Sequence, residues 1–577
     1  MGCAATHFGL CLTRPPADAG VAIFGFAEFI AALALLVLVF NSTDFLYRFR
    51  IAVAPFPLIL FTFLATAFIG FGSLLTDLWF AERWPALAWA VSRADIQAAL
   101  GAFFLLVALL WMWFAFISPP VFGRWNCKHF HHSVFQAIVR GSDTQLPVIG
   151  SELARSATPL LRHAAPGLAR RGANEDTPRF SKVERYAHDT LLMLGNRKLC
   201  RHIVATSPVT AIVVMQEASR LKRYDAPLGE FARNITTEAI LNKDSILYLE
   251  DDLYANDLVG QIQPFSKAMY GDYRLIEALG SARFSPLDID WRVAWSFNAA
   301  QFDAYCRLVL VTFRSFVAGD HYRGDSQTFY RAFEIIQEGT RDIGRLNGVA
   351  PDGEINDALA RLSAAVRFVV AAIDILEKRP NLDTGVLRAR KGSAGYRDES
   401  IFDRLAGLLY ELVNHAAWVQ TPSDRAWTVQ HNAVWSMLRR HGRVWKIVRF
   451  KLFRLLFDEI KEMETWPNFQ GASLLGFCLN VCGLTEERAG DFGREEKTLR
   501  KAIIRWTRRN YLAIVEKAPH VAEHCLSGGI SFDAENSRLV KTYIRGTRIE
   551  APKEYLPLLK PRPARRRSRA GGAGKVS

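Results

Sequence analysis

AALGAFFLLVALLWMWFAFIS, from Ala98 to Ser118, is a run of 21 residues without a charge. Two further apolar runs precede it, VAIFGFAEFIAALALLVLVF at 21–40 and IAVAPFPLILFTFLATAFIGFGSLL at 51–75. A helix rises about 1.5 Å per residue, so about 20 apolar residues cross the roughly 30 Å hydrocarbon core of a bilayer. The sequence therefore predicts three transmembrane helices, at about 21–40, 51–75 and 98–118.

The rest of the 577-residue chain has an ordinary helical pattern. Half of all residues are hydrophobic, which excludes an intrinsically disordered chain, and eight cysteines are too few for a disulfide scaffold. Apolar residues recur at three- and four-residue spacing in 209–222, 229–241, 299–317, 322–337 and 361–378. Strand patterns are weak, and the best of them lies at 530–548. We therefore predict an all-α protein, with three N-terminal transmembrane helices followed by a large, mostly α-helical cytoplasmic domain.

Composition divides the chain into four parts. Residues 1–120 form the predicted transmembrane domain, and 121–179 form a juxtamembrane segment and linker containing several prolines and glycines. The helical cytoplasmic domain covers 180–559, with a possible division into two lobes near 379–398. The basic tail at 560–577 contains seven lysines and arginines and no acid, which predicts disorder.

Basic residues at the ends of the spans predict the orientation. The first loop carries Arg48 and Arg50, and Arg124, Lys128 and Arg140 follow the third span before any acid. Because cytoplasmic loops are enriched in Lys and Arg, we expect an outside N-terminus and a cytoplasmic C-terminal domain. The chain is rich in alanine and arginine, and this favours a bacterial inner membrane.

Glu28 is an ionisable residue within the first apolar run. Such a group is costly in a bilayer and is usually partnered by another helix or by an aqueous cavity. One hypothesis is a proton or cation site. The alternative is a protonated Glu28 bonded to a neighbouring helix, or one that reaches the interface.

A cluster of potential metal ligands follows the third span, namely Cys127, His129, His131 and His132. Imidazole and thiolate groups bind zinc or copper. Their spacing matches no zinc-finger pattern, however, and a juxtamembrane histidine cluster also suits anchoring near lipid headgroups. The sequence itself specifies no cofactor.

His188 and Asp189 lie on a predicted helix and form a dyad like that of helical metal-dependent hydrolases. The nucleotide-binding loops and the G-x-S-x-G nucleophile motif are absent from the sequence. A chance dipeptide is the simpler explanation, because the chain contains thirteen histidines. The balance is against an enzyme without excluding one.

The segment 434–460 combines an apolar stripe with seven basic residues. They are Arg439, Arg440, Arg443, Lys446, Arg449, Lys451 and Arg454. A basic amphipathic helix suits anionic lipid headgroups or an acidic protein partner. It equally suits a surface helix whose apolar stripe packs into the protein core.

These features favour a multi-pass membrane protein whose cytoplasmic helical domain serves in regulation, scaffolding or interaction. The expected partners are the lipid bilayer and an acidic protein or anionic lipid surface, and nucleic acid is disfavoured. One alternative is a homo-oligomeric channel or transport component that uses Glu28. A further alternative is a metal-dependent hydrolase that uses His188 and Asp189.

Overall fold

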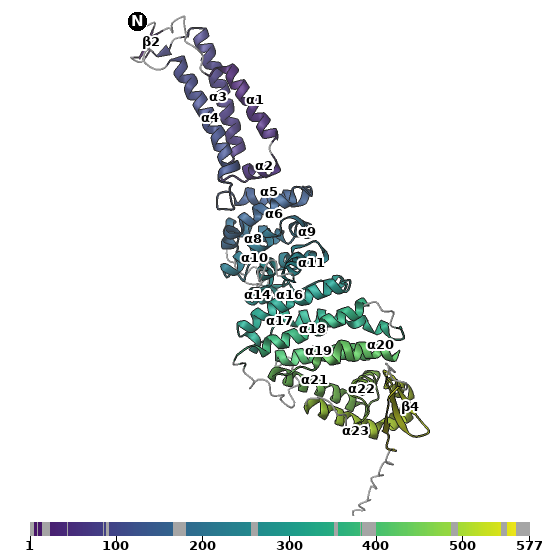
Figure 1. Cartoon of the computed structure of the whole chain (residues 1–577). Coiled ribbons are helices and arrows are strands. Elements are labelled where there is room, and N and C mark those ends of the chain that lie inside the picture. The colour runs from purple at the N-terminus through teal and green to yellow at the C-terminus, as the bar shows by residue number, and fades with distance from the viewer. Residues whose placement is uncertain are drawn as a thin grey trace, which may run out of the picture. The chain divides into compact units, whose positions relative to one another are not determined.

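The structure is a computed structural model. It describes residues 5–7, 10–13, 24–42, 44–84, 86–87, 92–165, 180–255, 263–350, 356–380, 382, 400–485, 494–543 and 551–560. Most of these residues are helical (Figure 1). The chain forms two compact units: unit 1 is Met1–Met269 with Ala278–Pro286, and unit 2 is Tyr270–Glu277 with Leu287–Ser577. The all-α prediction holds at this coarse level.

The first part of unit 1 contains the apolar helices. They are α1 (Phe26–Ser42), α2 (Phe45–Ala52), α3 (Leu58–Ala81) and α4 (Arg93–Met112), and a π-helical turn (Trp113–Ile117) extends α4. Among the described residues, Leu58–Ala81 and Arg93–Ile117 are single helices long and apolar enough to cross a membrane. Helix α1 has only 17 residues, or about 25 Å at the usual rise. Two of the three predicted spans are therefore supported as membrane helices by length and composition.

Prolines and a helix cap explain why the span boundaries differ from those predicted. The second span was expected to begin at Ile51, but Pro55 and Pro57 interrupt the helix, so α3 begins at Leu58 and continues to Ala81. The third span begins earlier than expected because Ser92 and Asp95 form a capping box at the start of α4.

Close packing joins α1 to α3. Gly70 of α3 faces the ring of Phe29, and a Cβ atom added at Gly70 would lie 2.6 Å from that ring. Phe29, Ile69 and Leu100 form a buried cluster that links α1, α3 and α4. A larger residue at position 70 would therefore separate α1 from α3.

The remaining helices of unit 1 follow the apolar helices along the chain. They are α5 (Cys127–Arg140), α6 (Leu146–Arg155), α7 (Ala157–His163), α8 (Lys182–Leu194), α9 (Arg197–Thr206), α10 (Val209–Arg220), α11 (Gly229–Leu241) and α12 (Ile246–Ala255). Helices α13 (Pro264–Tyr270) and α14 (Tyr273–Ala282) follow, and the boundary between the units falls within them. Helix α5 packs against α8, and α9 packs against α11.

Unit 2 continues the helical pattern. Its helices are α15 (Trp291–Ala294), α16 (Ala299–Ala318), α17 (Gln327–Glu338), α18 (Asp357–Glu377), α19 (Ile401–Ala417), α20 (Ser423–Trp427), α21 (Arg443–Glu462), α22 (Phe469–Cys482), α23 (Arg494–Lys517) and α24 (Pro519–His524). Short turns of other helix types lie at His321–Arg323, Arg341–Leu346, Thr428–Val434 and Trp435–Leu438. Helix α18 packs against α16 and α19, and α19 packs against α21.

Two small antiparallel sheets complete the fold. The first joins β1 (Ala5–His7), β2 (Leu10–Thr13) and β3 (Ala86–Leu87) in that order. The second joins β4 (Ile530–Asp533), β5 (Arg538–Thr542) and β6 (Lys553–Pro557), with Ile530 opposite Lys541 and Arg538 opposite Pro557. The segment 530–548, where a strand was expected, contains β4 and β5. The predicted lobe boundary at 379–398 and the basic tail fall almost wholly outside the described residues.

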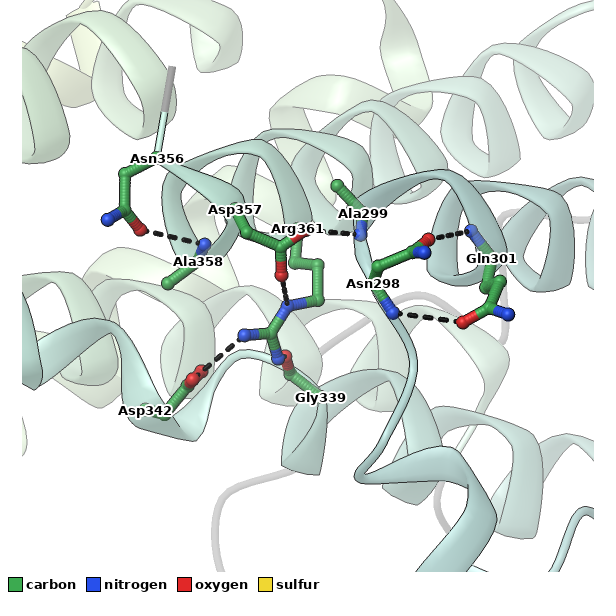
Figure 2. A network of polar contacts seen from close by, with 9 residues as sticks. All are labelled: Asn298, Ala299, Gln301, Gly339, Asp342, Asn356, Asp357, Ala358 and Arg361. Atoms are coloured by element: carbon green, nitrogen blue, oxygen red, sulfur yellow. Dashed lines mark hydrogen bonds and ion pairs between the residues drawn. The ribbon is translucent and has the colours of Figure 1, made fainter. Parts of the chain in front are cut away.

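A polar network fixes the start of α18 beside the start of α16 (Figure 2). The carboxylate of Asp357 accepts the backbone N–H of Ala299 at 2.6 Å and the Nε–H of Arg361 at 3.0 Å. Arg361 also donates to the carbonyl of Gly339 at 2.7 Å and to Asp342 at 2.8 Å. One guanidinium, 11% exposed, therefore satisfies acceptors from three consecutive parts of unit 2.

We predict that Arg361→Met lowers the free energy required to open α18 by about 2–3 kcal/mol. The change leaves the buried Gly339 carbonyl and the partly buried Asp342 carboxylate without their donor. Native-state hydrogen exchange of the full chain in nanodiscs measures this value. Arg367→Met on the same helix is the matched control. It removes a solvent-exposed pair with Asp303 and should cost less than about 1 kcal/mol. Equal effects of the two variants would contradict the assigned role of Arg361.

Candidate functional site

A polar cluster lies where α1 and α4 begin and α3 ends. The carboxylate of Asp77 accepts hydrogen bonds from the backbone N–H of Phe26, from Arg93 and from the side chain of Gln97, each at 2.9 Å. Gln97 is fully buried. Asp77 thus connects three helices. Sequence reasoning missed Asp77, although a single acid within the otherwise apolar helix Leu58–Ala81 was a usable signal.

Glu28 belongs to this same cluster. Its carboxylate accepts the backbone N–H of Gly25 at 2.9 Å. Because α1 begins at Phe26, Glu28 lies in the first turn of the helix, where a negative charge interacts favourably with the helix dipole. This contact resembles a helix cap. The predicted transport role of Glu28 stays a hypothesis.

At the opposite end of the apolar helices, Arg50 forms a buried ion pair with Glu152 of α6. Two guanidinium nitrogens of Arg50 lie 3.1 and 2.7 Å from Glu152 Oε1. A third donates to the carbonyl of Ala115, in the π-helical turn, at 3.1 Å. The side chains of Arg50 and Glu152 are 12% and 4% exposed. This pair therefore links the last turn of α2, the end of α4 and helix α6.

The four predicted metal ligands after the third span point in different directions on α5. Cys127 is buried, and its thiol contacts the carbonyl of Arg124. His131 bonds to Thr190 of α8 at 3.2 Å, whereas His129 and His132 are exposed. Across the described residues, no group of three or more His, Cys, Asp or Glu side chains is arranged to hold a metal ion.

The predicted dyad of His188 and Asp189 occupies α8, but the two side chains differ in environment. His188 is buried, and burial lowers its pKa below the ordinary value of 6.5. Asp189 is exposed, and its charge partly opposes the lowering for both His188 and His131. The catalytic role stays a prediction.

The predicted helix at 434–460 is interrupted, and this boundary was wrong. Helix α21 begins only at Arg443, because Gly442 has a φ of 159° that no helix accommodates. The carboxylate of Glu377 caps the N-terminus of α21 by accepting hydrogen bonds from the backbone N–H groups of Arg443 and Val444, each at 2.8 Å.

Several of the seven basic residues in this segment contact acids within unit 2. Arg440 lies 3.3 Å from Asp374, and Arg454 lies 3.4 Å from Asp458. Arg449 and Arg439 are farther from their partners, at 3.8 Å from Glu495 and 4.0 Å from Glu496. The buried Lys451 pairs with Asp403. Arg443 contributes its backbone N–H to the cap, and Lys446 is exposed. Most of the charge is therefore balanced internally, which favours the packed-helix interpretation of this segment. The lipid or partner surface expected here stays a hypothesis.

An aromatic pair that the sequence analysis did not assign to a site lies on α15. Trp291 and Trp295 are 53% and 57% exposed, and their ring centroids are 4.7 Å apart in an edge-to-face arrangement. The guanidinium of Arg292 lies 5.1 Å from the Trp291 ring. Asp290 accepts the backbone N–H of Arg292 and caps the helix, which holds the pair at the surface of unit 2.

Comparison with known proteins does not add a function. No protein-family model matches the chain, and neither a curated protein nor a solved structure shows significant similarity to it. The functional argument therefore rests on the residues and contacts described above.

The buried His188 predicts a pH-dependent stability. Its pKa is lowered in the folded protein, so the unfolded chain binds the proton more readily. Its contribution to stability is complete above pH 6.5 and is lost as pH falls through the folded-state pKa, at about 1.4 kcal/mol per unit of difference. We expect His188→Gln to reduce the loss of melting temperature between about pH 7.5 and about pH 5.5.

The measurement is thermal unfolding of the full chain in nanodiscs at each pH. His131 and His415 also have pKa values lowered by burial, so some pH dependence will persist in the variant. His520→Gln is the control, since His520 is 88% exposed. An unchanged pH slope in His188→Gln would refute the prediction.

Proposed function

We propose that the protein is a membrane-anchored interaction protein, whose helical body lies in the cytoplasm of a bacterial cell and binds a protein partner. Helices α3 and α4 supply the anchor. Their outer faces carry large, exposed apolar side chains that suit contact with lipid. Examples are Phe63, Phe68, Phe71, Leu105 and Leu109.

The distribution of charge at the two ends of α3 and α4 supports the proposed orientation. One end contains Arg48 and Arg50. The start of α5 lies at this same end, since Asn126 donates to the carbonyl of Val53 at 2.8 Å. Arg124 and Lys128 add to the positive charge at this end. At the other end, Arg83 and Arg93 are accompanied by acids. Those acids are Glu28, Asp77, Glu82 and Asp95. Positive charge is typical of the cytoplasmic side.

The observation that carries the proposed interaction function is the exposed pair Trp291 and Trp295. Tryptophan and arginine are enriched at the energetic centres of protein interfaces, and α15 presents two tryptophans around Arg292. Burying apolar surface stabilises a complex by about 25 cal/mol per Å², so a large exposed aromatic pair is a strong candidate contact. The Asp290 cap fixes the backbone of this short helix, and the two rings contact each other edge to face. This arrangement lowers the entropic cost of binding.

Cysteine labelling tests the orientation and the partner together. Six native cysteines are buried. With Cys3 and Cys11 replaced by serine, a new surface cysteine therefore reports on its own environment. We compare Arg292→Cys, between the two tryptophans, with Lys446→Cys on α21. A membrane-impermeant maleimide should label neither in intact cells. After permeabilisation, Arg292→Cys should react at least about tenfold more slowly than Lys446→Cys, because the partner covers it.

The purified protein is the control, in which both cysteines should react at similar rates. Labelling in intact cells would contradict the cytoplasmic orientation. Equal rates at both positions in permeabilised cells would contradict a partner at the tryptophan pair.

A further inference from the structure

Helix α5 has two faces of different character. Cys127, Phe130, Val134 and Ala137 are buried at three- and four-residue spacing. This face packs against α8. The Phe130 ring also packs against the Phe49 ring of α2, with the ring centroids 5.9 Å apart. The described residues leave the opposite face uncovered, so α5 is an amphipathic helix with one exposed side.

The uncovered face carries large apolar side chains. Trp125, just before the helix, is 87% exposed, and Phe135 and Val139 are 49% and 61% exposed. A soluble surface helix normally presents polar residues on this side. Aromatic and aliphatic side chains here indicate that something apolar covers them.

The same face is positively charged. Arg124, Lys128 and Arg140 are exposed, together with His129 and His132. The sequence contains no acid between Asp95 and Asp143. Helix α5 contains no acid. Among the described residues, no ion pair joins Lys128 or Arg140 to an acid on another element. The face therefore combines apolar groups with uncompensated positive charge.

Specific contacts place α5 at the end of the apolar helices. Asn126, the residue before α5, donates to the carbonyls of Val53 and Val121 at 2.8 and 2.9 Å. Val53 precedes α3, and Val121 lies shortly after the helical turn that extends α4. Helix α5 runs across this end of the apolar helices (Figure 1). It is therefore positioned where a membrane surface would meet unit 1.

We propose that the uncovered face of α5 binds anionic phospholipid at the membrane surface. Trp125, Phe135 and Val139 insert among the headgroups, and Lys128 with its basic neighbours contacts the lipid phosphates. A basic residue near an anionic surface and an amphipathic helix with aromatic residues both suit this location. The inference rests on the membrane anchoring by α3 and α4 in the proposed function, and it adds a lipid-binding surface to that anchor.

Spin-label accessibility in reconstituted bilayers tests this inference. The full chain carries Phe135→Cys in a background with Cys3 and Cys11 replaced by serine. Leu192→Cys is the matched control, because Leu192 is 48% exposed on α8, which packs on the opposite face of α5. Oxygen concentrates in the lipid and the nickel complex stays in water, so a spin label in the bilayer collides more often with oxygen. In bilayers with about 30% phosphatidylglycerol, the ratio of oxygen to nickel-complex collision rates for the label at 135 should exceed the ratio at 192 by about tenfold.

Charge reversal tests the recognition of anionic lipid. Lys128→Glu should lower the ratio at 135 several-fold, as should bilayers of phosphatidylcholine alone. Lys182→Glu makes the same change of charge on α8 and should have no effect.

Each other outcome overturns the inference. A ratio at 135 equal to that at 192 would show that α5 faces water. Low accessibility to both collision partners would show a protein cover. A collision ratio at 135 that is unchanged by Lys128→Glu and by lipid charge would exclude recognition of anionic headgroups. Flotation of the same vesicles reports separately on the anchor, so a failure of the proposed function is distinguishable.

Discussion

The ion pair between Arg50 and Glu152 is the constraint on which unit 1 depends. A charge removed from water is tolerated only when its partners replace the lost hydration, and this pair is nearly inaccessible. Arg50 also donates to the carbonyl of Ala115 in the π-helical turn, where the altered hydrogen-bond pattern leaves backbone groups to satisfy. The end of α4, the last turn of α2 and the second half of α6 therefore depend on one guanidinium. The headgroup surface proposed for α5 is positioned through the same junction.

Elsewhere, single carboxylates join helices or cap their N-termini. Asp77 connects α1, α3 and α4, and Glu377 caps α21. Glu250 accepts two backbone N–H groups at the start of α13, at 2.6 and 3.1 Å. Each carboxylate satisfies donors that a helix terminus would otherwise leave free. By contrast, the exposed groups on α15 and on α5 combine aromatic rings with positive charge, which is the chemistry proposed here for recognition.

The sequence predicts local structure well where periodicity and caps coincide. Helix α11 matches its predicted bounds of 229–241, and α16 differs from its prediction by one residue. Errors arose where one backbone feature outweighed the apolar pattern, as at Gly442 and Pro57. The sites were harder to predict because pairs such as Arg50 and Glu152 lie 102 residues apart, and no local pattern indicates them. Exposure of Trp291 and Trp295 likewise depends on how α15 packs, which composition does not reveal.

A double-mutant cycle at Arg50 and Glu152 tests the central constraint most directly. Arg50→Met and Glu152→Met should each lower the free energy of unfolding of unit 1 by about 3–5 kcal/mol, because each leaves a buried charge unpaired. The double variant should lose clearly less than the sum, with a coupling of at least about 2 kcal/mol. Hydrogen exchange of α5 and α6 in nanodiscs reports the value. Additive losses, or single variants within about 0.5 kcal/mol of the unaltered chain, would contradict the account.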